Sequence, residues 1–200
     1  MTTPESSELL GTPKAEFLRS VRQALGRGDV PPAEPYPRLT DTVLEMEEQS
    51  SQIRKRLEEN LPALLDKLAE MAALGGWNVH RALGVEEAIG YIESVARDSE
   101  ATNVVRSAQD VFDSVPVDAA LANMGLKVTT VERDETNTRE ALREEIRQSG
   151  IGITGADYAL AETGSLVVLP RQGLSRLVSL VPPVHIALVR PQDLLESLDD

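Results

Sequence analysis

The sequence predicts an α/β fold, an open, doubly wound and mostly parallel sheet with helices on both faces, preceded by a helical extension. Three observations support this expectation. From residue 76 onward, short apolar runs alternate with amphipathic helical patterns, which is typical of parallel sheets. Residues 150–189 form the most apolar long segment of an otherwise acidic chain. Residues 1–75 show helical periodicity and a proline-rich stretch but no strand pattern.

The extension, residues 1–75, is expected to precede an α/β domain at residues 76–200. Residues 1–13 lack any periodicity and predict a loose tail, whereas residues 14–25 place apolar side chains at helical spacing. Residues 30–39 carry four prolines, which exclude a regular element and indicate a linker or an extended arm.

A second helical region is expected between Asp41, which can cap it, and the glycines that follow residue 74. Pro62 lies inside its apolar pattern, so we expect a break near Asn60.

The α/β part is divided by its apolar runs and turn signals. The expected strands are residues 77–81, 102–106, 126–131, 150–154, 165–169 and 184–189, and the expected helices are residues 85–97, 108–124 with an interruption at Pro116, 137–148 and 191–198. Residues 155–164 are too few for a full crossover helix, which indicates either a single helical turn or a hairpin-like return.

Composition excludes several classes of function. With 33 Asp and Glu against 20 Lys and Arg, the net charge of -13 would repel a nucleic-acid backbone. The absence of cysteine excludes disulfides, thiolate metal sites and iron–sulfur clusters held by this chain. No apolar run approaches the roughly 18 residues of a membrane span, and no signal-peptide pattern is present, so we expect a cytoplasmic protein.

Candidate functional residues gather at the end of the expected strand 150–154, because ligands of parallel sheets bind outside the carboxyl ends of the strands. Gly155 would let the backbone approach a ligand, and a helix starting at Asp157 would offer free amides beside Thr154. The alternative is that Asp157 only caps that helix.

A second group of candidates follows in Glu162, Thr163 and Gly164, a carboxylate, a hydroxyl and a glycine beside an apolar strand. Glu162 could act as a general acid or base or as a covalent nucleophile. The alternative, which the frequency of structural ion pairs favours, is that Glu162 pairs with Arg171 or Arg176.

The third group is the polar stretch that contains Arg171, Arg176 and Ser179, whose arginines could bind a carboxylate or phosphate. The alternative is that both arginines are solvated surface residues. His185 lies in an expected strand and His80 is the only other histidine, so we expect a hydrogen-bonded structural role for His185 and no metal site. No dinucleotide fingerprint, phosphate loop or serine elbow is present.

The string GITGADYALAETGSLVVLP, followed by Arg176 and by SLVPPVHIALV, resembles the signature of the LutC/YkgG family of LUD-domain proteins, lactate utilisation protein C. The resemblance covers roughly residues 77–198. It implies a fold similar to that of ribose-phosphate isomerases and class I coenzyme A transferases. It also implies a role in oxidising L-lactate to pyruvate beside two partners, one of them iron–sulfur binding.

Within that wider fold, Gly155-Ala156-Asp157 resembles the turn that bears an active-site acid in sugar-phosphate isomerases. Glu162-Thr163-Gly164 resembles the Glu-Asn-Gly of coenzyme A transferases, whose glutamate forms a thioester, although threonine replaces asparagine here. Similar folds do not transfer activity by themselves.

Together these observations lead to an expected function as an accessory or ligand-binding subunit of an L-lactate oxidation system, with iron–sulfur partner proteins and a small anionic ligand. A stand-alone enzyme acting on a sugar phosphate or an acyl thioester is the alternative, with Asp157 and Glu162 as its candidate catalytic residues. A structural adaptor is the third hypothesis. The residues alone leave open whether the protein is catalytic.

Overall fold

The computed structural model describes residues 14–24, 43–132, 138–169 and 175–200, and the chain divides into two units, Met1–Met46 and Glu47–Asp200. Helix α1 (Lys14–Ala24) lies in the first unit and confirms the helix expected there. The expected tail, the proline-rich arm and the cap at Asp41 lie outside the described residues.

The core of the second unit is a parallel sheet of four strands. These are β1 (Asn103–Ser107), β2 (Lys127–Val131), β3 (Ile151–Gly155) and β6 (Val184–Leu188), in the order β2-β1-β3-β6. Strand β2 lies on one side of β1, and β3 lies on the other side. The order in which strands are added to the sheet therefore switches sides between β1 and β3. Such a switch opens a crevice at the carboxyl ends of the two strands.

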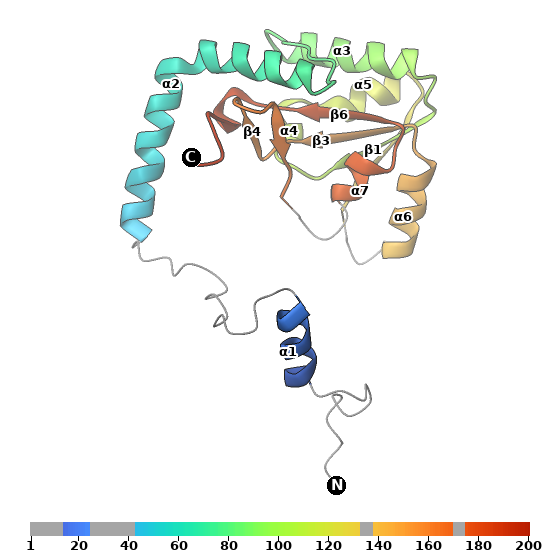
Figure 1. Ribbon diagram of the computed structural model, residues 1–200. Coiled ribbons are helices and arrows are strands. Elements are labelled where there is room, and N and C mark those ends of the chain that lie inside the picture. The colour runs from blue at the N-terminus through green and yellow to red at the C-terminus, as the bar shows by residue number, and fades with distance from the viewer. Residues whose placement is uncertain (1–13, 25–42, 133–137, 170–174) are drawn as a thin grey trace. The chain divides into compact units, whose positions relative to one another are not determined.

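Helices cover both faces of this sheet (Figure 1). They are α3 (Val85–Asp98), α4 (Val111–Ser114), α5 (Val117–Asn123), α6 (Arg139–Gln148) and α7 (Ser175–Leu180). Val104 of β1 packs in the core formed with α3, α4 and α5, whereas its neighbour Val105 packs in a second core with α6 and α7. This alternation confirms the doubly wound α/β fold.

A second, smaller sheet contains β4 (Tyr158–Leu160), β5 (Ser165–Val167) and β7 (Leu194–Leu195) in the order β5-β4-β7. Strands β4 and β5 are antiparallel, which confirms the hairpin-like return between β3 and β5. This sheet packs against α2 (Val43–Leu74), whose Leu57 and Leu64 are buried in the same apolar cluster as Ala159 and Leu194. Much of α2 therefore belongs to the compact unit.

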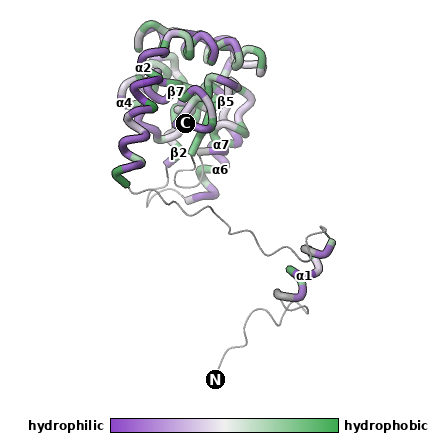
Figure 2. The backbone as a smooth tube through the Cα atoms, turned by 60° about the vertical axis from the view of Figure 1, so that its left-hand side comes forward, coloured by the Kyte–Doolittle hydropathy of each residue, from purple (hydrophilic) through white to green (hydrophobic). Residues whose placement is uncertain are grey.

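Helix α2 continues through Pro62, so the expectation that the helix breaks near Asn60 is wrong. Figure 1 shows instead that α2 bends between its two halves, and a proline removes one helical hydrogen bond and bends a helix without ending it. Asn60 donates its side-chain amide to the Arg56 carbonyl and caps no new helix. Hydrophilic and apolar residues alternate along α2, as on an amphipathic helix (Figure 2).

Two further expectations are wrong. Residues 77–81 form no strand, because His80 stacks on Tyr91 of α3 and Arg81 pairs with Asp66 of α2, which ties this segment to helices. Residues 191–198 form no α-helix, because a short 3-10 turn, Pro191–Asp193, leads into β7, whose backbone pairs with β4.

Among the described residues, no helix is both long enough and apolar enough to cross a bilayer.

Candidate active-edge site

The candidate site is the carboxyl edge of the main sheet at the β1/β3 crevice. Gln109 follows β1, Asp157 follows β3 and Arg190 follows β6, so parallel strands bring together residues that lie up to 81 positions apart in the sequence. We define the active edge as Ser107, Gln109, Asp110, Thr154, Gly155, Asp157, Arg190 and Asp193.

Gln109 connects the two sides of the crevice. It is only 5% exposed, and its Oε1 accepts hydrogen bonds from Ser107 Oγ at 2.5 Å and from the backbone N–H of Gly155 at 2.8 Å. Two donors on the same atom fix the orientation of the amide, so Nε2 must face the other way, where it lies 3.3 Å from Asp157 Oδ2. Gln109 therefore links β1 to β3 and to the candidate carboxylate.

Gly155 permits this arrangement. An added Cβ at Gly155 would lie 2.8 Å from Val111 Cγ1 and 3.3 Å from Gln109 Cβ, so a larger residue would push Gln109 out of the crevice. The close approach that the glycine allows is to a side chain of the same protein.

Asp157 precedes a strand, so the expected helix starting at Asp157, and with it a helix-capping role, is wrong. Its N–H donates to the Val167 carbonyl at 2.8 Å, which begins the pairing of β4 with β5. Its Oδ2 also accepts the backbone N–H of Leu169 at 2.7 Å. The carboxylate thus fixes the segment that leaves β5 and stays half-buried at the crevice.

Arg190 is held by two carboxylates. Its Nε lies 2.6 Å from Asp193 Oδ2 and its Nη1 lies 3.1 Å from Asp110 Oδ2, which ties the end of β6 to the loop after β1. The hydrogen bond with Asp193 raises the pKa of Arg190 further, so this guanidinium stays charged. The active edge therefore contains three carboxylates, Asp110, Asp157 and Asp193, and one arginine that already pairs with two of them.

His185 has the structural surroundings that the sequence predicts. Its Nε2 shares a 2.9 Å hydrogen bond with Oγ1 of the fully buried Thr154, and Trp77 packs edge-on against its ring at 5.8 Å between centroids. Burial lowers the pKa of His185, which favours the neutral imidazole.

The second group of candidates lies away from the crevice. Glu162, Thr163 and Gly164 form the turn between β4 and β5, and the carbonyl of Glu196 accepts the Glu162 N–H at 3.0 Å. Since Asp157 and Glu162 flank β4 at opposite ends, the structure does not bring the two candidate catalytic carboxylates together. Among the described residues, Glu162 makes no ion pair with Arg176.

The third group is on α7 and beside it. Arg176 is exposed. The Ser179 hydroxyl donates a hydrogen bond of 3.0 Å to the Arg176 carbonyl in the same helix. Gly152 of β3 contacts α7 so closely that an added Cβ would lie 1.9 Å from the Val178 carbonyl oxygen. Arg171 lies outside the described residues.

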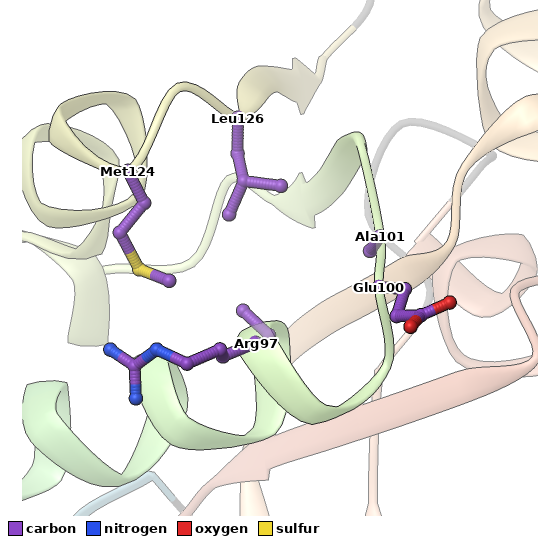
Figure 3. Close-up of a pocket in the computed structure, with 6 residues that line it drawn as sticks. Arg97, Glu100, Ala101, Met124 and Leu126 are labelled. Atoms are coloured by element: carbon purple, nitrogen blue, oxygen red, sulfur yellow. The ribbon is translucent and has the colours of Figure 1, made fainter.

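A hollow of about 430 Å³ opens at the opposite edge of the sheet, where β1 and β2 begin. Figure 3 shows Met124, Leu126 and Arg97 around it, with the Glu100 carboxylate directed away from Arg97. Its polar groups are exposed side chains of α3 and the following turn, and it contains no counterpart of the buried amide at Gln109. The carboxyl edge is therefore the better candidate for a functional site.

Sequence reasoning missed Ser107, Gln109, Asp110, Arg190 and Asp193. The first four follow an expected strand, and the rule that ligands bind at carboxyl ends applies to every parallel strand. Applying that rule to residues 107–110 and 190, and not only to residues 154–157, would have found these four, whereas Asp193 lies in the expected helix 191–198 and gave no such signal.

Comparison with known proteins decides the family. The model of the LUD domain matches residues 65–200. The chain belongs to the LUD domain family. This confirms the resemblance at the level of the family. No solved structure matches the chain, so the expected likeness to isomerases and coenzyme A transferases stays a prediction.

Curated relatives of this LUD-domain chain are longer proteins. Lactate utilization protein B of Bacillus licheniformis is 25% identical over 197 residues, which cover 76% of this chain and 41% of the relative. Lactate utilization protein B of Lysinibacillus sphaericus is 24% identical over 202 residues, covering 78% and 42%. A protein of Escherichia coli K12 named "Uncharacterized electron transport protein YkgF" is 26% identical over 190 residues, covering 72% and 40%.

The chain thus spans about two fifths of the length of these relatives. Two of these relatives are named lactate utilization protein B, whereas the sequence resembles protein C, so the expected subtype within the family stays a prediction.

Proposed function

We propose that this LUD-domain chain is an accessory, ligand-binding subunit of a cytoplasmic system that oxidises L-lactate to pyruvate. The observation that carries the proposal is the Gln109 bridge, which joins the carboxyl ends of β1 and β3 beside Asp157 in a domain whose relatives are named for lactate utilisation. The chain has no cysteine, so iron–sulfur centres of such a system would be held by partner proteins.

The active edge suits a small hydroxy or keto acid. A carboxylate such as Asp157 can accept a hydrogen bond from a ligand hydroxyl, and an exposed arginine such as Arg176 can bind the ligand carboxylate. Arg190 already pairs with Asp110 and Asp193. The positive charge that binds the ligand carboxylate would therefore come from Arg176 of α7 or from Arg171.

The separation of Asp157 from Glu162 by β4 favours binding over a mechanism that needs both carboxylates at one substrate. The isomerase-like or transferase-like alternative predicts turnover by the purified protein alone. If Asp157→Asn or Glu162→Gln abolished that turnover, the protein would be a stand-alone enzyme and not an accessory subunit.

Growth on L-lactate tests the proposal. A strain that lacks the gene and any paralogue should fail to grow on L-lactate as sole carbon source, and the wild-type gene should restore growth. Asp157→Asn should restore it poorly, whereas the control Asp98→Asn, an exposed residue of α3, should restore it fully. Normal growth of the deletion strain would rule the proposal out.

A further inference from the structure

Helix α1 presents an apolar face that its own unit leaves uncovered. Phe17 is 58% exposed, and Leu18 and Val21 are each 39% exposed. Val21 lies four positions after Phe17 and three after Leu18, and residues at these spacings lie on the same side of a helix, so these three side chains form one stripe, which we call the α1 stripe. Every α1 residue whose burial is described is exposed.

The charge of α1 is opposite to that of the rest of the chain. Its segment KAEFLRSVRQA has three basic residues and one acidic residue, a formal charge of +2. Since the whole chain carries -13, the other residues together carry -15. Helix α1 is thus a basic amphipathic helix in an otherwise acidic chain, and that combination favours an anionic partner.

The size of the stripe favours a lipid surface over a protein. A stable protein–protein interface takes roughly 20–30 residues on each side, whereas α1 offers three apolar side chains on 11 residues. A short helix with low overall hydrophobicity, basic residues and one apolar face is instead the pattern of a helix that lies in the interface of an anionic bilayer.

The negative charge of the rest of the chain is screened over about 8 Å at physiological salt, so it opposes contact between α1 and an anionic surface only at short range.

We propose that α1 is a peripheral membrane-binding helix, which inserts Phe17, Leu18 and Val21 among the headgroups of an anionic bilayer. Three apolar side chains and a charge of +2 give weak, reversible binding that salt weakens. The proposal goes beyond the lactate-related role and is independent of the active edge.

Vesicle sedimentation of the full chain tests whether α1 binds an anionic bilayer. The anionic vesicles contain one part phosphatidylglycerol to two parts phosphatidylcholine, and vesicles of pure phosphatidylcholine serve as the neutral surface. The wild type should sediment with the mixed vesicles and not with the neutral ones, and less so at high salt. Phe17→Ala, which keeps helix propensity, should lower the partition coefficient about tenfold. Leu83→Ala removes an apolar side chain that is 98% exposed on the second unit, and should change nothing.

Three results would overturn the proposal: no binding of the wild type to mixed vesicles, equal binding by Phe17→Ala, or equal binding to neutral vesicles. Light scattering in solution adds a fourth. If Phe17→Ala dissociated an oligomer that the wild type forms, the α1 stripe would be an interface with a second copy and not a lipid site.

Discussion

Gln109 has a structural task that can be measured separately from any ligand. In Gln109→Ala, the buried N–H of Gly155 and the hydroxyl of Ser107 lose their acceptor. Leaving a buried donor unsatisfied costs about 1–3 kcal/mol, so the free energy of unfolding should fall by that amount in urea denaturation. The exposed Gln148→Ala should stay within about 0.5 kcal/mol of the wild type. Equal stabilities of the two variants would mean that the bridge does not form.

His185 should make stability depend on pH. Burial lowers its pKa in the folded state below the ordinary value of 6.5, so the unfolded chain binds the proton more readily. Stability from this residue is complete above pH about 6.5 and declines as the pH falls from there toward the lower pKa of the folded state.

Urea denaturation at several pH values from about 7.5 down to about 5, on both sides of the ordinary histidine pKa, checks this sign. His185→Gln should remove the histidine-dependent part of the decline, whereas His80→Gln should keep it. A decline that is identical in wild type and His185→Gln would show that His185 does not cause it.

Gly152 is required by the contact between β3 and α7. In Gly152→Ala, the new Cβ would lie 1.9 Å from the Val178 carbonyl oxygen, so α7 must move, at a cost of about 1–3 kcal/mol or more. Gly90→Ala is the control, because Gly90 is exposed within α3 and has open space around it. That variant should gain about 0.5–1 kcal/mol from helix propensity. Destabilisation by both alike would contradict the packing argument.

At the scale of elements, the turn between β4 and β5 is packed against α2. Gly164 has φ +68°, and an added Cβ would lie 2.3 Å from the Ala72 backbone nitrogen. Gly164→Ala should therefore destabilise the protein by about 1–3 kcal/mol beyond the conformational cost of the positive φ. Gly125→Ala measures that conformational cost alone, because Gly125 has φ +83° and open space. Equal losses in urea denaturation would show that the turn does not rest on α2.

The same scale shows which elements the sequence can predict. The strands β1, β2, β3 and β6 and helices α3 and α6 follow from local sequence patterns, because the strands form short apolar runs in the core and each of the two helices buries one face against it. The strand expected at residues 77–81 and the helix expected at residues 191–198 fail because their partners are distant in sequence. Arg81 pairs with Asp66, and β7 pairs with β4.

The candidate site was partly predictable for a related reason. Thr154, Gly155 and Asp157 are adjacent in sequence and share the end of β3, so local reading finds them. The bridge to Gln109 depends on the strand order, which places β1 beside β3 although β2 comes between them in the chain. Local patterns do not encode that order.

At the scale of the whole molecule, the second unit should fold without the first. Val43, Leu44 and Met46 are exposed, so a chain of residues 47–200 should lose less than about 1 kcal/mol of unfolding free energy. A chain that starts at residue 65, where the family match begins, lacks the buried Leu57 and Leu64. Its free energy of unfolding should be lower by at least about 2–5 kcal/mol. Urea denaturation compares the two, and equal stability would place α2 outside the core.

The central proposal for this protein is that the β1/β3 crevice is the ligand site of a lactate-oxidising system. Its most direct test is a titration of the isotopically labelled full chain with L-lactate and with pyruvate, followed by backbone amide chemical shifts. We expect saturable shifts centred on Gln109, Gly155 and Asp157, weakened in Asp157→Asn. Shifts centred on the hollow at Arg97 and Met124, or no saturable shift with either acid, would contradict the account.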